Sequence, residues 1–310
     1  MNPTLLLDLG NTRLKWALLE GEHWRESGAC RHVDIPQWIE AMRARLPAST
    51  RRFGVNVAHD RLALELERQL GPIRWLVAEA QCCGVTNGYD EPERLGADRW
   101  AALIAAHHLH DGAALVVCCG TATTVDWLEA DGRFRGGLIL PGLTTMRESL
   151  VRATAKLPLA AGEVRLPPTN TRDAIASGCL LAQVGAIEHY YRVMEGTACG
   201  AVALVSGGDA EIIAAHLAIP ARTVDNLVLR GLAVVAAAST RPTPSHDTRE
   251  TAPRATRPGP SSTNPSSRRT APTSPPISPP LRHPRSGRTA SRSIPPRWPR
   301  SFPSRSSNRR

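Results

Sequence analysis

The chain has 310 residues and a formal net charge of +10, and that charge is concentrated at one end. Residues 241–310 hold 16 of the 26 prolines and 15 arginines against two acids, so they carry +13 and leave −3 on residues 1–240. This segment is rich in Pro, Arg and Ser and poor in apolar residues, so it cannot bury enough apolar surface to form a core. We therefore predict a disordered tail over 239–310. The slightly acidic remainder does not indicate a nucleic-acid-binding protein, and its length suits two modest lobes.

The tail has two interpretations. A run rich in Pro, Arg and Ser is what a shifted reading frame yields in GC-rich DNA, and a chain with only two lysines indicates such DNA. The alternative is a nucleic-acid-binding arm, although neither interleaved aromatic residues nor a repeated motif supports it.

The cysteines and the hydropathy predict a reduced, cytoplasmic protein. Four of the seven cysteines form two adjacent pairs, Cys82-Cys83 and Cys118-Cys119, which cannot close ordinary disulfides within a pair. No C-x-x-C spacing indicates zinc or redox chemistry. Asp8 interrupts the apolar N-terminal run, so we expect neither a signal peptide nor a membrane span.

A hairpin is the first predicted element. Two apolar runs flank a turn at residues 10–12, which is typical of two strands joined by a tight turn. Gly10 lets the backbone approach a ligand, and the following amides with the Thr12 hydroxyl can surround a phosphate oxygen beside Lys15. Asp8 ends the first strand, and an acid beside a phosphate loop usually acts through Mg²⁺. An ordinary hairpin with a surface Asp is the alternative.

Strands and helices then alternate, which indicates an α/β lobe. Helical spacing covers 35–46 and 61–70, and strands are predicted at 53–58 and 73–78.

A polar loop over 88–99 leads into an alanine-rich helix at 100–108. Asp98 and Arg99 fall at the helix start, where an Asp can accept backbone N–H bonds and complement the helix dipole. The functional alternative is a carboxylate held at a cleft, with Arg99 and Tyr89 gripping a substrate. Spacing alone favours helix capping by Asp98.

A second strand–turn–strand unit covers 115–128, with Gly120 and Thr121 at the turn. Two such units, each opening about half of the folded region, indicate a duplicated fold. Two phosphate loops facing one cleft would suit a nucleotide.

The remaining elements complete the second half. Thr171 can cap a helix or place its hydroxyl on a substrate, and Gly207-Gly208 can form a turn or admit a flat ring such as adenine. The predicted elements are a strand at 133–140 closed by Pro141-Gly142, helices at 143–154, 171–193 and 226–236, and a strand at 202–206.

Taken in order, these motifs resemble the type III pantothenate kinases, a family of the actin-like ATPase superfamily of acetate and sugar kinases. The resemblance covers about residues 3–238 and leaves the tail unmatched. It implies an α/β fold of two duplicated ribonuclease H-like lobes, 1–110 and 111–238, around a central cleft. The motifs are Asp8–Thr12, Leu95–Arg99, Gly120–Asp126, Gly136-Gly137 with Pro141-Gly142, Asn170-Thr171 and Ser206–Asp209.

The resemblance implies transfer of the ATP γ-phosphate to the primary hydroxyl of pantothenate, the first step of coenzyme A biosynthesis. Asp98 would be the general base, and positioning with charge neutralisation would supply most of the catalysis. The implied ATP residues are Asp8 (also on Mg²⁺), Leu9, Gly10, Asn11, Thr12, Arg13, Leu14, Lys15 and Thr121. The implied pantothenate residues are Tyr89, Gly96, Ala97, Asp98, Arg99 and Thr171.

One position departs from the family. Many members carry an Asp where Cys118 stands, and that Asp ligates K⁺ or NH₄⁺. A neutral thiol is a poor ligand for such a hard ion. Either the dependence on a monovalent cation is weakened here or another oxygen substitutes.

The resemblance also implies a homodimer with the acceptor site near the interface. A different class of function is a catalytically silent regulatory protein on the same fold, of the accessory transcription factor type. Retention of both Asp8 and Asp98 argues for activity.

Overall fold

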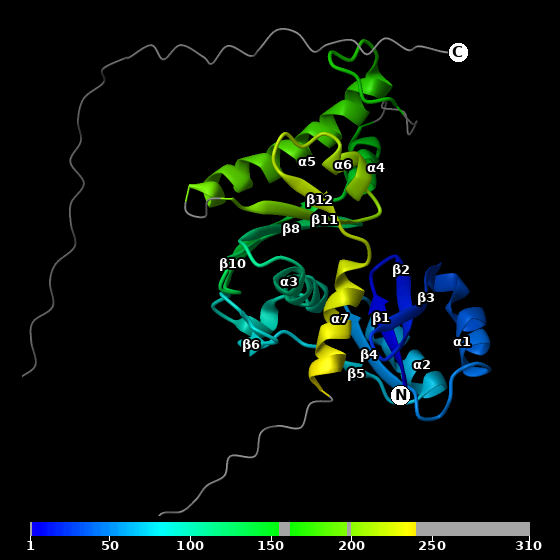
Figure 1. Ribbon diagram of the computed structural model, residues 1–310. Coiled ribbons are helices and arrows are strands. Elements are labelled where there is room, and N and C mark those ends of the chain that lie inside the picture. Colours follow the sequence, from blue (N-terminus) through cyan, green and yellow to red (C-terminus); the bar gives the residue numbers. More distant parts are fainter. Residues whose placement is uncertain (1, 155–161, 197–199, 240–310) are drawn as a thin grey trace, which may run out of the picture. The chain divides into compact units, whose positions relative to one another are not determined.

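Two five-stranded sheets form the framework of the protein (Figure 1). The computed structural model describes residues 2–154, 162–196 and 200–239. The predicted tail lies outside the described residues from position 240 onward. No helix within the described ranges is long and apolar enough to cross a membrane.

The first sheet has the strand order β3-β2-β1-β4-β5. Its first three strands are antiparallel neighbours, whereas β4 and β5 run parallel to β1. Apolar side chains of β1 pack with α1 (Ile35–Arg43) and α2 (Asp60–Leu70) on one face. The strands are β1 (Pro3–Leu9), β2 (Arg13–Glu20), β3 (His23–Arg31), β4 (Arg51–Asn56) and β5 (Arg74–Trp75).

The second sheet repeats this plan. Its order is β10-β9-β8-β11-β12, with antiparallel pairing among the first three and parallel pairing of β11 and β12 to β8. The same order and the same directions confirm the predicted duplicated α/β fold. The strands are β8 (Ala114–Cys119), β9 (Ala122–Leu128), β10 (Phe134–Pro141), β11 (Val202–Gly207) and β12 (Ala221–Thr223).

Three helices cover one face of the second sheet. They are α4 (Leu143–Ala153), α5 (Thr171–Glu195) and α6 (Ala210–Ala214). Leu180, Val184 and Ile187 of α5 are buried against the apolar side chains of β8 and β11. Their spacing along α5 places them on one helix face.

Helices α3 (Ala97–Leu109) and α7 (Leu227–Ala238) lie side by side between the two sheets (Figure 1). Residues 100–106 of α3 are at most 1% exposed. Helix α3 packs mainly with α7, and it also contacts β8 and β9 of the second sheet and β4 of the first. Leu229 and Leu232 of α7 pack against β1 and β4 of the first sheet. A Cβ at Gly231 would lie 1.8 Å from the Ala101 carbonyl oxygen, so Gly231 permits this close crossing.

Several short or exposed elements differ from the sequence prediction. Strand β3 is mostly exposed and β12 entirely so, which removes the apolar alternation that identifies a strand. The strand predicted at 73–78 contracts to β5, and a small hairpin of β6 (Gln81–Cys82) and β7 (Val85–Thr86) precedes α3. Single 3-10 turns, η1 (His32–Asp34) and η2 (Pro92–Arg94), complete the set.

Candidate active site

The two Gly-Thr turns differ by one residue in length, and they meet. The Gly10 amide donates to the Arg13 carbonyl (3.1 Å), and the Gly120 amide donates to the Ala122 carbonyl (3.0 Å). The hydroxyls of Thr12 and Thr121 lie 2.7 Å apart. The structure thus brings together the two turns that the sequence predicts as phosphate loops.

Hydrogen bonds to a backbone carbonyl support each turn, and they come from residues to which the sequence analysis assigned no role. A ring nitrogen of His32 lies 2.8 Å from the Gly10 carbonyl oxygen. The Thr121 carbonyl accepts from the Thr145 hydroxyl (2.8 Å) and the Gly142 amide (2.9 Å). These supports fix the backbone of both turns, and only tertiary packing reveals them.

The predicted ATP residues divide into two groups. Asn11, Thr12 and Arg13 are exposed at the tip of the first turn, and Thr121 is exposed at the second. Leu9 and Leu14 are fully buried in the core of the first sheet. Their side chains therefore cannot contact a nucleotide, and only their backbone is available to one.

Asp8 is a buried carboxylate beside the first turn. It lies opposite Lys15 in the β1–β2 register and is 7% exposed. Burial raises the pKa of Asp8 to about 6, with the Lys15 ammonium lowering it and the Asp98 carboxylate raising it. Within the described ranges no hydrogen bond or ion pair involves this carboxylate, which leaves its oxygens available to a ligand.

Asp98 occupies the first turn of α3 but does not cap it. The N-cap residue is Gly96, and no side chain caps the helix. Oδ1 of Asp98 accepts from the adjacent Arg99 amide (2.8 Å). Burial raises the pKa of Asp98 above its ordinary value, and Arg99 and Lys15 oppose that shift. Asp98 and Asp8 therefore belong to one electrostatically coupled cluster with Lys15.

Arg99 forms a buried ion pair with Asp126 of β9. Its Nε donates to Oδ2 (3.1 Å) and its Nη2 to Oδ1 (2.5 Å), while Nη1 donates to the Tyr89 hydroxyl (2.9 Å). Burial opposes the charge on Arg99, but Asp126 and Tyr89 outweigh it and raise the pKa of Arg99. Asp126 ends one of the motifs quoted from the sequence, but its pairing with Arg99 was not predicted. An acid within the apolar run of a strand is the signal that indicates such a pair.

Thr171 does not join this cluster in the described chain. Its neighbour Asn170 is the N-cap of α5 and accepts from the Asp173 amide (3.0 Å). Thr171 instead lines a pocket of about 530 Å³ between α4 and α5, together with Met146 and Ile175. The capping interpretation of Thr171 is wrong, and its hydroxyl is exposed.

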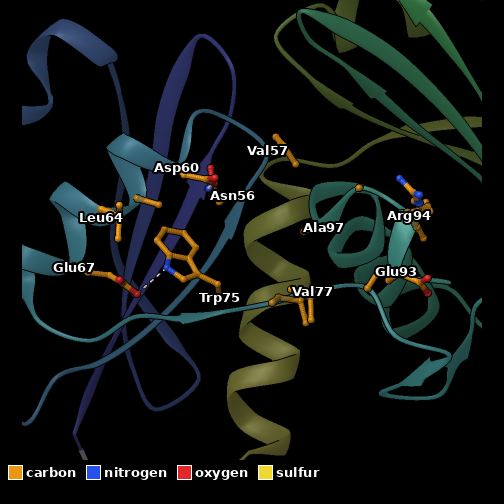
Figure 2. Close-up of a pocket in the computed structure, with 15 residues that line it drawn as sticks. Asn56, Val57, Asp60, Leu64, Glu67, Trp75, Val77, Glu93, Arg94 and Ala97 are labelled. Carbon is orange, nitrogen blue, oxygen red and sulfur yellow. Dashed lines mark hydrogen bonds between the residues drawn. The ribbon is translucent and has the colours of Figure 1, made fainter. Parts of the chain in front are cut away.

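A larger pocket, of about 600 Å³, opens beside the N-terminus of α3, and Gly96 and Ala97 are part of its lining. Figure 2 shows Trp75 between α2 on one side and Ala97 on the other, with its indole Nε1 donating to Glu67 (2.9 Å). Three carboxylates, Asp60, Glu67 and Glu93, and one guanidinium, Arg94, also line it. Its charge does not favour an anionic ligand.

Comparisons with known proteins identify the family of the chain. Residues 4–193 match the family model described as Type III pantothenate kinase. A type III pantothenate kinase of Aromatoleum aromaticum is 48% identical over 236 residues, which cover 75% of this chain and 97% of that protein. One of Azoarcus sp. is 47% identical over 240 residues, or 76% and 90% of the two chains.

A solved structure of a Baf-family protein from Campylobacter jejuni, described as a transcriptional activator, has a TM-score of 0.51 at 21% identity. The match covers 76% of this chain and 98% of that one. At that identity the likeness shows the fold alone. Because the family model spans more than half of the sequence and relatives above 40% identity are matched over nearly their whole length, the chain belongs to the type III pantothenate kinase family.

Proposed function

We propose that this protein phosphorylates pantothenate with ATP, giving 4′-phosphopantothenate in the first step of coenzyme A biosynthesis. The observation that carries the proposal is the 2.7 Å contact between Thr12 and Thr121 beside the coupled carboxylates of Asp8 and Asp98. Family membership supports pantothenate as the acceptor. A reaction that draws on ATP and a coenzyme precursor suits the cytoplasmic location that the sequence predicts.

The chemistry follows from the charges in the site. Backbone amides of both turns and the Lys15 ammonium would bind the ATP phosphates. Asp8 fits Mg²⁺, because it is an oxygen ligand without a partner in the described chain. Mg²⁺ bound with ATP would neutralise phosphate charge. Asp98, with a raised pKa, would take the proton of the acceptor hydroxyl as it attacks the γ-phosphate.

On the acceptor side, we propose that Tyr89 presents its ring and hydroxyl to pantothenate while Arg99 holds it. Asp126 occupies two guanidinium nitrogens, so Arg99 positions Tyr89 more than it grips substrate. Gly96 and Ala97 would contribute backbone next to Asp98. The exposed Thr171 hydroxyl would complete the site within a homodimer, and the exposed aliphatic side chains of Leu138 and Ile139 on β10 support such an interface.

The direct test is ATP-dependent formation of phosphopantothenate by the full-length chain, followed by mass spectrometry of the product. We expect ADP release to require pantothenate and not acetate or glucose, which other kinases of the superfamily accept. A protein that binds ATP but transfers no phosphate to pantothenate would support the silent regulatory alternative instead.

The residues near Cys118 do not fit a bound K⁺ or NH₄⁺ ion. Burial raises the pKa of Cys118 well above its ordinary value, and the nearby Asp126 and Asp98 raise it further, so the thiol stays protonated. The carboxylate of Asp126 is taken by Arg99. Hard monovalent cations prefer oxygen ligands. We propose that Lys15, whose ammonium acts on this thiol, supplies positive charge here and that the reaction runs without a monovalent cation.

Replacing Cys118 with Asp tests this proposal. We expect the unmodified protein to have the same activity in K⁺ and in tetramethylammonium salts of equal ionic strength. C118D should gain a K⁺-dependent increase in activity, because the variant offers a carboxylate oxygen, whereas C118S should gain none. Strong activation of the unmodified protein by K⁺ would show that another oxygen binds the ion.

Replacing Asp8 with Asn should abolish ATP turnover and yet stabilise the fold. Because burial raises the Asp8 pKa from 3.8 to about 6, the folded state favours the neutral acid. The contribution of Asp8 to the free energy of unfolding is fully present below the pKa that Asp8 has in the unfolded chain, and it is lost as the pH rises through 6. D8N should therefore gain on the order of 3 kcal/mol at pH 8 and about half of that at pH 5.

Urea unfolding of D8N and of the unmodified chain at both pH values measures this gain. E22Q, at an exposed acid on the turn between β2 and β3, serves as the matched control and should change little. Equal stability of D8N and the parent at pH 8 would mean that the carboxylate is not penalised by burial.

A further inference from the structure

The hairpin before α3 has an unusual turn. Cys82 pairs with Val85 across β6 and β7, so Cys83 and Gly84 are its two central residues. Their φ values of +49° and +83° are both positive, as in a type I′ turn. Such turns favour Asn or Gly at the first central position, and here that position is a cysteine.

This turn places two neighbouring sulfur atoms on the same side. The Sγ atoms of Cys82 and Cys83 are 3.6 Å apart, and both side chains are half-buried. Adjacency alone does not produce this arrangement. Cys118 and Cys119 are also neighbours, but on strand β8 they face opposite sides and pack in different cores.

The pair is poorly suited to the usual reactions of thiols. A disulfide usually joins Cα atoms at least 4.4 Å apart, whereas consecutive Cα atoms are 3.8 Å apart, so ring closure would be strained. Burial, together with the neighbouring Cys83 thiol, raises the pKa of Cys82 to about 12, which suppresses the thiolate that attacks alkylating reagents and peroxides.

A reagent that forms one bond to each of two protonated thiols avoids both the strained disulfide ring and the need for a preformed thiolate. It spans the gap between the sulfurs instead of closing it, and the second bond forms within one molecule, at high effective concentration. Sulfur is a soft ligand and favours soft, thiophilic acceptors.

We propose that Cys82 and Cys83 form a chelating site for trivalent arsenic. With an organoarsenic oxide, both S–H bonds break and two As–S bonds form. The As=O bond is replaced, and its oxygen leaves with both protons as water. No atom changes oxidation state, so no separate oxidant or reductant is required.

Occupation of this site acts on the acceptor side of the active site, a consequence that rests on the proposed function. The backbone N–H of Asn87 donates to the Ala80 carbonyl (2.9 Å), and this bond closes the base of the hairpin. Its Oδ1 accepts from the Tyr89 amide (3.1 Å), and Tyr89 in turn contacts Arg99. Distortion of the turn therefore shifts Tyr89, which raises the KM for pantothenate and leaves the KM for ATP unchanged.

Intact-mass spectrometry of the reduced full-length chain with phenylarsine oxide tests the site. We expect a single adduct that survives excess glutathione, a monothiol, and that 2,3-dimercaptopropanol removes. In C83G the cysteine is replaced by glycine, which adopts a positive φ readily, so the variant should preserve the turn. C83G and C82S should lose the resistant adduct, whereas C30S and C199S should keep it.

Three results would overturn the site: no glutathione-resistant adduct, a resistant adduct that persists in C83G, or a second one at another pair. The mass readout does not depend on kinase activity, so failure of the proposed reaction leaves it interpretable. With an active preparation, the effect of the arsenical on both KM values can also be measured. A raised KM for ATP, with no change in the KM for pantothenate, would refute the proposed effect of the turn on Tyr89.

Discussion

Replacing Asp98 with Asn is expected to lower kcat for pantothenate phosphorylation by about 100- to 10,000-fold, the range that a positioned general base contributes. The carboxamide has nearly the same shape but cannot take the hydroxyl proton. ATP affinity should be unchanged, because the predicted phosphate contacts come from the two turns. Steady-state kinetics and ATP titration of D98N measure both quantities.

The pH dependence gives an independent check on Asp98. Burial raises the pKa of Asp98. As the pH is lowered, kcat of the unmodified protein should therefore begin to fall at a pH above the ordinary pKa of a carboxyl group. D90N, at an exposed acid of the preceding loop, is the matched control and should keep the parental kcat. If D98N turned over as fast as the parent, the base would have to be another group.

Replacing Asp126 with Ala is expected to destabilise the fold by about 3–5 kcal/mol, because it leaves one charge of a buried ion pair without its partner. Arg99 is only 5% exposed and donates two hydrogen bonds to Asp126. Chemical denaturation of D126A against the parent measures the loss. Activity should fall as well, since Arg99 would no longer hold Tyr89 in place.

An exposed pair on α2 provides the comparison. Arg68 and Glu65 are 2.8 Å apart, with side chains 68% and 41% exposed. E65A should therefore destabilise the fold far less than D126A does. A double variant with Arg99→Met and Asp126→Leu should recover much of the stability lost in D126A, because neither charge remains buried. A loss in D126A no larger than that in E65A would show that the pair contributes little.

The sequence was sufficient for the central hairpins of the two sheets, because their signals are local, but not for the exposed strands β3 and β12. The apolar runs around residues 10–12 and 120–121 mark two equivalent hairpins, and their repetition predicts the duplicated fold. The pairing of Arg99 with Asp126 joins two elements 27 positions apart, and no periodicity connects them. The packing of α3 and α7 is likewise invisible, because an apolar helix does not specify which sheet it covers.

Within the site, the glycines and acids were predictable and their environment was not. Asp98 could be placed near a helix start, but only the structure shows that Gly96 is the N-cap and that burial raises the Asp98 pKa. The hairpin of β6 and β7 escaped prediction because its turn carries Cys83 where Asn or Gly is the usual signal.

The position of α7 constrains how this protein can be made. Leu229, Leu232 and Ala236 fill the core beneath β1 and β4, although they are translated more than 170 residues after those strands. The N-terminal sheet therefore cannot complete its core while the ribosome is still synthesising the middle of the chain. Vectorial folding, in which an N-terminal domain is finished first, is unavailable to it. The nascent chain must wait, with apolar surface open to chaperones, until α7 emerges.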